Sequence, residues 1–246
     1  MNAKKLSFLL LILVAVACTN RSTSSEQDEM RHWNNVLQQI NALLLENKAR
    51  QTLDLAKQTL PEILESAEKN GTTDTLIYYA RKIFNACGNN YINTKQYKDG
   101  IDYMDSIGNH PLIREHCPHE LLSFKAGLNQ LYGNNPEAVR LAEDYLQLPV
   151  CTSANDFIRQ AEIISGVYMY SGNNLPKAIQ ILEKAIDVYR KGGNFPNMLR
   201  IMSRLGIYYH LSGEYEKAIA TNQESIATYN DSLAPGIVVI AYGEQA

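Results

Sequence analysis

Residues 202–229 read MSRLGIYYHLSGEYEKAIATNQESIATY. The first half predicts a helix, because small and apolar residues recur every three or four positions: Met202, Leu205, Gly206 and Tyr209. Ser212 and Gly213 interrupt the pattern and predict a turn. The second half predicts another helix, whose apolar face is formed by Tyr215, Ala218, Ile219, Ser225, Ile226 and Tyr229. Small residues in both halves predict two helices that pack closely across the turn.

The spacing of Leu205-Gly206, Tyr209 and Ala218 around a glycine turn resembles a tetratricopeptide repeat (TPR). The small residue of the second helix recurs along the chain as Ala49, Gly100, Ala138, Ala178 and Ala218. The first of these steps is the longest, and the other three are nearly equal. The resemblance implies an all-α protein, a TPR-like helical-hairpin solenoid of about five repeats wound as a right-handed superhelix.

Local signals place the ends of several helices. Thr72-Thr73 is predicted to cap one helix, and Asn135 is predicted to cap another, with Pro136 as its first helical residue. Pro61 is predicted to end or kink the second helix of the first repeat. Pro111 and Pro118 predict a linker between the second and third repeats.

The N-terminus has the composition of an export signal. Lys4 and Lys5 precede a mostly apolar run, 6–17, which is too short to span a membrane as a helix. The end of this run, VAVAC at 14–18, resembles the lipobox of bacterial lipoproteins. The resemblance implies a signal peptide at 1–17 and a lipid on Cys18, in a Gram-negative bacterium. The alternative is an ordinary secretory signal with an incidental cysteine.

The remaining chain divides into two parts. Residues 18–29 contain no large apolar side chain and are predicted to form a flexible tether. Residues 30–246 are predicted to form the repeat domain, with an incomplete last unit. The apolar segment 237–242 either packs on the fifth repeat, or the chain is a shortened form of a longer protein.

Charge and motifs exclude several classes of function. The net charge is −3, or 21 − 26 = −5 without Lys4 and Lys5, and no basic stripe indicates a nucleic-acid partner. We find no catalytic or phosphate-binding motif, so we expect no enzyme activity and no cofactor. We expect no metal site either, although one loop is rich in ligand residues: His110, His116, Cys117 and His119. Cys87 is predicted to be a core residue. The sequence does not decide whether Cys117 and Cys151 form a disulfide.

The TPR resemblance implies a concave groove lined by the first helix of each repeat. Its inward positions include Lys82, Asn85, Asn89, Glu120, Arg159, Glu162, Arg200, Ser203 and His210. An open solenoid surface of this kind implies a protein or peptide partner.

The predicted function is therefore a non-catalytic scaffold or adaptor, anchored by its lipid to the inner or outer membrane of the cell envelope, with the domain in the periplasm or at the cell surface. One alternative is the TPR sensor half of a membrane-linked helix-turn-helix regulator, since similar arrays form such sensors. Another alternative is a surface glycan-binding lipoprotein, since tyrosine-rich faces stack on sugars.

Overall fold

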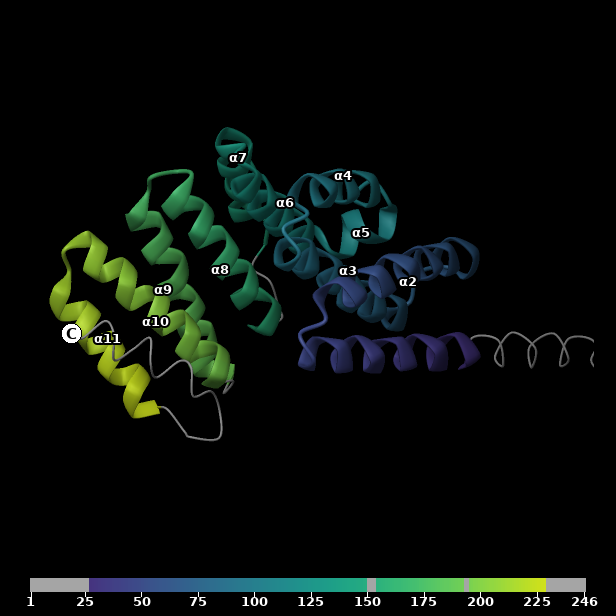
Figure 1. Cartoon of the computed structure of the whole chain (residues 1–246), viewed down its shortest axis with the longest axis horizontal. Helices are drawn as coiled ribbons and strands as arrows, with labels where there is room; N and C mark the ends of the chain where they lie inside the picture. Colours follow the sequence, from purple (N-terminus) through teal and green to yellow (C-terminus); the bar gives the residue numbers. More distant parts are fainter. Residues whose placement is uncertain (1–26, 150–153, 193–194, 229–246) are drawn as a thin grey trace, which may run out of the picture. The chain divides into compact units, whose positions relative to one another are not determined.

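The computed structural model describes residues 27–149, 154–192 and 195–228 (Figure 1). Within these ranges every regular element is helical. Residues 27–45 form the first helix, followed by α2 (Ala49–Asn70), α3 (Asp74–Asn93), α4 (Tyr97–Ile107), α5 (Pro111–His116), α6 (Pro118–Tyr132), α7 (Asn135–Gln147), α8 (Ala154–Tyr170), α9 (Leu175–Gly192), α10 (Phe195–Ser212) and α11 (Tyr215–Thr228). These helices belong to two compact units, Met1–Asn90 and Tyr91–Ala246.

Some predicted features lie outside the described residues. These are the signal peptide, Cys18, Cys151 and the segment 229–246. Residues 27–29, placed in the tether by composition, are already helical. The rest of the tether also falls outside the described ranges.

Each hairpin turn contains one residue with positive φ. These residues are Asn47 (56°), Lys95 (58°), Gly133 (95°), Asn173 (45°) and Gly213 (82°). In four of the turns, the next residue donates its backbone N–H to a carbonyl five residues earlier, as Glu214 does to Tyr209 at 2.8 Å. A left-handed residue with this bond ends a helix and reverses the chain. The predicted helical-hairpin fold is thereby confirmed at the level of the backbone.

The turns also correct the register of the first repeat. Gly100, Ala138, Ala178 and Ala218 each lie five residues after the left-handed turn residue, and all four are buried. Five residues after Asn47 comes Thr52, which is completely buried, whereas Ala49 only begins α2. The Thr52 hydroxyl donates to the Lys48 carbonyl at 3.0 Å, so a polar residue fits the buried position. With Thr52 in place of Ala49, the first step is shorter and closer to the others.

One further prediction is wrong in detail, and two open points are resolved. Pro61 does not end α2, which continues to Asn70. The capping position of α7 is Asn134 rather than Asn135, and its side chain donates to the Asn129 side chain at 3.1 Å instead of capping the helix. The predicted linker between Pro111 and Pro118 contains the short helix α5, because a proline is favoured in the first turn of a helix.

The first unit contains a hairpin of the 27–45 helix and α2. Glu29 accepts a hydrogen bond from Ser66 at 2.8 Å, and His32 lies 3.3 Å from Glu62, so the two helices run antiparallel. Apolar residues of the unit are buried at helical spacing: Trp33, Val36 and Ile40, then Leu53, Ala56, Leu60, Ile63 and Leu64, then Ala80, Ile83, Phe84 and Cys87. Cys87 is confirmed as a core residue.

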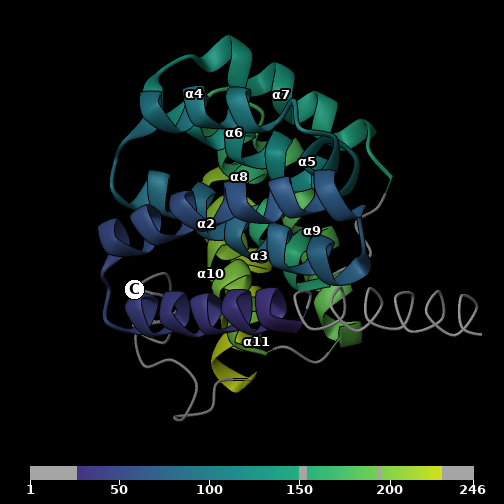
Figure 2. The same ribbon diagram turned by 90° about the vertical axis from the view of Figure 1, so that its right-hand side faces the viewer.

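The second unit stacks successive hairpins, and Figure 1 shows α8, α9, α10 and α11 in this arrangement. α4 packs on α6, α6 on α7 and α8, α8 on α9, and α10 on α9 and α11. Figure 2 shows the same ribbon with α4, α6 and α7 labelled. One continuous core runs from Ala126 to Ala218, and Tyr168 and Tyr208 are among its largest members.

The last helix buries part of the predicted face. Ala218, Asn222 and Ser225 are buried, whereas Tyr215 is 59% exposed and Ile219 is 48% exposed. The buried residues are small or short because α11 approaches α10 closely at Gly206. A Cβ atom added to Gly206 would lie 2.3 Å from the Asn222 Oδ1.

Candidate functional site

Two arginines of α10 bind one glutamate of α8. Arg200 Nη2 lies 2.7 Å from Glu162 Oε2, and Arg204 Nη2 lies 3.6 Å from Glu162 Oε1. Arg204 Nη1 also donates to the backbone carbonyl of Glu162 at 3.2 Å. The Glu162 side chain is 12% exposed, while those of Arg200 and Arg204 are 42% and 40% exposed. The glutamate thus lies beneath two guanidinium groups that still face solvent.

A third arginine belongs to the same cluster. Arg159 lies on α8, three residues before Glu162, and both residues influence each other electrostatically. Burial, and then the positive charge of Arg200, lower the pKa of Arg159, while Glu162 raises it. We call Arg159, Glu162, Arg200 and Arg204 the arginine cluster. Its formal charge is three cations minus one anion, or +2.

Arg200 has a hydrogen-bond donor that Glu162 does not satisfy. A guanidinium group has five N–H donors, whereas one carboxylate offers about four lone-pair sites. The buried Nε of Arg200 has no hydrogen-bond partner among the described residues. The side chains of Arg200 and Arg204 are partly exposed, so their guanidinium groups can still meet a group from outside the protein.

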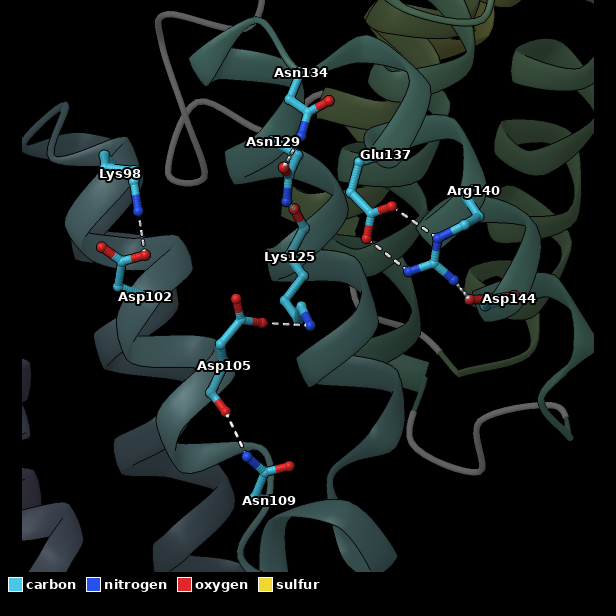
Figure 3. Close-up of polar contacts among 10 residues, drawn as sticks. All are labelled: Lys98, Asp102, Asp105, Asn109, Lys125, Asn129, Asn134, Glu137, Arg140 and Asp144. Carbon is cyan, nitrogen blue, oxygen red and sulfur yellow. Dashed lines mark hydrogen bonds and ion pairs between the residues drawn. The ribbon is translucent and has the colours of Figure 1, made fainter.

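Other polar contacts of this unit are balanced. In Figure 3, Lys98 faces Asp102 on α4, Lys125 of α6 reaches Asp105 of α4 at 2.5 Å, and Arg140 binds two acids within α7, Glu137 and Asp144. Three cations here meet four carboxylates. The hydrogen bond from Arg140 lowers the pKa of Glu137, as expected for an ordinary ion pair. These contacts join or brace helices and leave no surplus positive charge.

The structure places the residues of the predicted groove in different surroundings. Arg159, Glu162 and Arg200 converge in the arginine cluster. Glu120 and Ser203 are buried, and the Ser203 hydroxyl donates to the Leu199 carbonyl at 3.0 Å. His210 is exposed, and its ring packs edge-on with the ring of Tyr215, with 5.3 Å between the ring centroids. The other three lie on α3 in the first unit, where the Lys82 ammonium stands over the Tyr78 ring: Lys82, Asn85 and Asn89.

Sequence reasoning missed Arg204. The signal was present, because Arg204 follows Arg200 by four residues, and residues four apart lie on the same side of a helix. Arg204 is more than one repeat step away from Arg159, so a search for identical residues at equal repeat steps does not find it. Only the packing of α10 against α8 brings the three arginines together.

The histidine-rich segment has structural contacts. His110 caps α5 by accepting the Leu112 N–H on Nδ1 at 3.2 Å, and His119 Nε2 lies 2.7 Å from the Pro149 carbonyl. Cys117 is buried and, like Cys87, is not in a disulfide. Across the described ranges, no group of three or more histidine, cysteine or acidic side chains could hold a metal ion.

An acidic cavity lies between α9, α10 and α11. Its volume is about 330 Å³, and its lining includes Glu183, Asp187 and Glu224 above Met202 and Leu205. Arg190 binds Glu224 at 2.7 Å, and the Tyr209 hydroxyl donates to Glu183. Arg190 Nη1 also lies 3.6 Å from Asp187 Oδ1, so each of the three carboxylates has a partner within the protein. The charged residues of the lining are three acids and one arginine, with a formal charge of 1 − 3 = −2.

Comparison with known proteins supports a TPR protein. Residues 161–231 match the family model described as tetratricopeptide repeat. BtubC (BKLC) from P. vanneervenii has a similar structure at a TM-score of 0.58 and 10% identity, over 80% of this chain and 84% of that one. The nearly identical TPR-like repeats of a Podosopora anserina protein, described as a kinesin light chain, match at a TM-score of 0.50 and 12% identity, over 81% of this chain and 95% of that one.

These likenesses show the fold, an all-α TPR-like solenoid. No curated protein matches the chain. In the part of the chain that the structure describes, no helix has the length and apolar character needed to cross a membrane. A TPR fold indicates a protein-interaction scaffold, because stacked repeats present an extended surface.

Proposed function

We propose that this TPR protein is a non-catalytic scaffold that binds a protein or peptide partner on the face of α8 and α10. The observation that carries the proposal is the arginine cluster, in which Arg200 and Arg204 of α10 bind Glu162 of α8, the helix that also carries Arg159. Arginine is enriched at protein interfaces, because its planar fork binds carboxylates and backbone carbonyls while its stem packs on apolar surface.

Photo-crosslinking tests the proposal. A photoreactive amino acid at Ile207, on the face of α10 that carries Arg200 and Arg204, is expected to capture a discrete partner in living cells. The same group at Gln180, an exposed residue of α9, is the control. The Arg159→Glu, Arg200→Glu double variant is expected to abolish capture from Ile207. Equal capture from Ile207 and Gln180, or capture that survives the double variant, would contradict the proposal.

The proposal includes attachment to a bacterial envelope membrane through a lipid on Cys18. Its support is the sequence alone: the cationic start, the apolar run and the small residues before Cys18. A single acyl chain binds membranes only weakly, so stable anchoring takes two or more chains on the cysteine and its amino group. The sensor and glycan-binding alternatives remain predictions that no described feature tests.

Cys18→Ala is expected to move the protein from the membrane fraction to the soluble fraction. The reason is that the acyl chains supply the membrane affinity, about 0.8 kcal/mol for each buried CH₂ group. Fractionation followed by immunoblotting measures the change, with Cys87→Ala as a control that leaves Cys18 intact. A Cys18→Ala protein that stays with the membrane and resists high salt would refute the lipid anchor.

A further inference from the structure

Asn70 and Gly71 form the junction between α2 and α3. Asn70 is the last residue of α2, and residues 71–73 connect it to Asp74, where α3 begins. Asn70 and the three connecting residues are all exposed. An asparagine is followed by a glycine at this one place in the sequence. Because glycine has no Cβ, its backbone nitrogen can approach the preceding side chain more easily than that of any other residue.

The backbone of Gly71 is unhindered. Its φ is 84°, and a Cβ atom added there would have nothing within 4 Å. No carbonyl among the described residues accepts a well-formed hydrogen bond from the Gly71 N–H. By contrast, Gly108, which follows α4, donates its N–H to the Met104 carbonyl at 2.9 Å. The nitrogen of Gly71 therefore has both the space and the freedom to reach the Asn70 side chain.

Asp99 and Gly100 provide an internal contrast. An aspartate before a glycine can undergo the same kind of attack, but this pair lies inside α4, where Gly100 is buried. The Gly100 N–H donates to the Gln96 carbonyl at 2.9 Å. A Cβ atom added to Gly100 would lie 3.0 Å from Leu128 Cδ1 and 3.0 Å from Tyr91 Cβ. The helix and its neighbours therefore hold the nitrogen of Gly100 in place.

We propose that Asn70 is a site of spontaneous deamidation, in which its side-chain amide becomes a carboxylate. The Gly71 nitrogen loses its proton to a base and forms a bond to Asn70 Cγ. The bond from Cγ to Nδ2 breaks, and ammonia leaves. Water then opens the cyclic imide at either carbonyl, which gives aspartate or isoaspartate. The net reaction converts amide and water to carboxylate and ammonium without electron transfer, and it does not depend on the proposed scaffold function.

The reaction would change the contacts that join the 27–45 helix to α2. Asn70 Nδ2 donates to Ser66 Oγ at 3.2 Å, and the Ser66 hydroxyl donates to Glu29 Oε2 at 2.8 Å. A carboxylate has no proton to donate, so the product and Glu29 would compete for the single hydroxyl proton of Ser66. One hydrogen bond of this chain is lost, and two anions face the same hydroxyl.

The new charge also falls at an unfavourable place. The C-terminus of a helix carries a partial negative charge, which repels an anion. The neighbouring cation, Lys69, already binds Glu65 at 2.6 Å, and this hydrogen bond raises the pKa of Lys69. A carboxylate at position 70 is therefore added without a counter-ion of its own. We infer that deamidation loosens the 27–45 helix from α2.

Peptide mapping by mass spectrometry tests the modification on the full-length chain in a nonionic detergent. The protein is incubated in mildly acidic or mildly alkaline buffer, and the exchange of –NH₂ for –OH is followed at each asparagine. We expect Asn70 to change faster than any other asparagine, and faster in alkaline buffer, because base removes the proton of the Gly71 nitrogen. Asn70→Gln, which lengthens the side chain, should suppress the change. An Asn70 that changes no faster than the other asparagines would overturn the proposal.

Hydrogen exchange tests the structural consequence. Asn70→Asp, which imitates one product, is expected to speed amide exchange in the 27–45 helix about tenfold, because a hydrogen bond to a buried hydroxyl is lost. Asn70→Gln keeps an amide donor and is the control, with exchange close to that of fresh wild type. Exchange in α8, in the second unit, should be the same in all variants. Equal exchange of the 27–45 helix in Asn70→Asp and Asn70→Gln would overturn the inferred loosening.

Discussion

Gly206→Ala is expected to lower the free energy of unfolding by about 1–2 kcal/mol, although alanine is the better helix former by about 1 kcal/mol. The added Cβ would lie 2.3 Å from Asn222 Oδ1 and 3.0 Å from its Cγ. Asn222 is 1% exposed, so its side chain has little room to move away. Either α10 and α11 separate or Asn222 leaves its place, and both disturb the core of the last hairpin.

Gly166→Ala is the matched control. An added Cβ there has only the Gln130 Oε1 within 4 Å, at 3.9 Å, so the gain in helix propensity is not opposed. We expect this variant to be about 0.5–1 kcal/mol more stable than the wild type. Urea unfolding followed by circular dichroism measures both changes. If Gly206→Ala does not destabilise the protein, the α10–α11 contact is not as close as described. Destabilisation by Gly166→Ala would instead show that the space beside Gly166 is not open.

A double variant separates the clash from other effects. Gly206→Ala combined with Asn222→Ala removes the side chain that the new methyl group meets, and is expected to recover part of the loss. The coupling energy of the cycle should be about 1 kcal/mol, because residues in direct contact are not independent. If the effects of the two substitutions on the free energy of unfolding simply add, the cost of Gly206→Ala does not arise from its contact with Asn222.

Glu162→Gln is expected to lower the free energy of unfolding by about 1–3 kcal/mol at low salt, because Arg200 and Arg204 lose the carboxylate that they share. The value is below that for a fully buried pair, since Arg200 and Arg204 remain partly exposed, at 42% and 40%, and water screens their repulsion. Added salt should reduce the loss, since salt screens like charges.

Glu224→Gln is the comparison variant. Glu224 also binds an arginine, Arg190, but its side chain is 45% exposed. An ion pair of this exposure contributes about 0.5 kcal/mol or less. In a background that carries Arg200→Gln, the cost of Glu162→Gln should shrink, because less repulsion remains. Equal costs for Glu162→Gln and Glu224→Gln would show that the cluster is an ordinary surface ion pair.

The helical hairpins could be predicted from sequence because their determinants are local. The small residue of the second helix recurs at near-equal steps, so Gly100, Ala138, Ala178 and Ala218 are found without a structure. The register of the first repeat was predicted wrongly because a threonine, Thr52, occupies the position of the small residue. Thr52 can be buried only because its hydroxyl bonds the Lys48 carbonyl, and apolar pattern alone does not reveal that bond.

The candidate site was predicted only in part, because it depends on packing between helices. Transfer of inward positions from the TPR resemblance identified Arg159, Glu162 and Arg200. It could not distinguish exposed positions from Glu120 and Ser203, which neighbouring helices bury. Similarly, periodicity placed Tyr215 and Ile219 on the packed face of α11. The close approach at Gly206 keeps Ala218 and Ser225, which were predicted there, and adds Asn222.

The continuous core from Ala126 to Ala218 has a consequence for how the second unit folds. Its helices pack on partners that are near in sequence, so few long loops must close before stabilising contacts form. Folding can therefore start at any of the hairpins and spread to its neighbours, as in other chains of stacked repeats. Low contact order of this kind favours rapid folding and leaves little time for exposed apolar surface to aggregate.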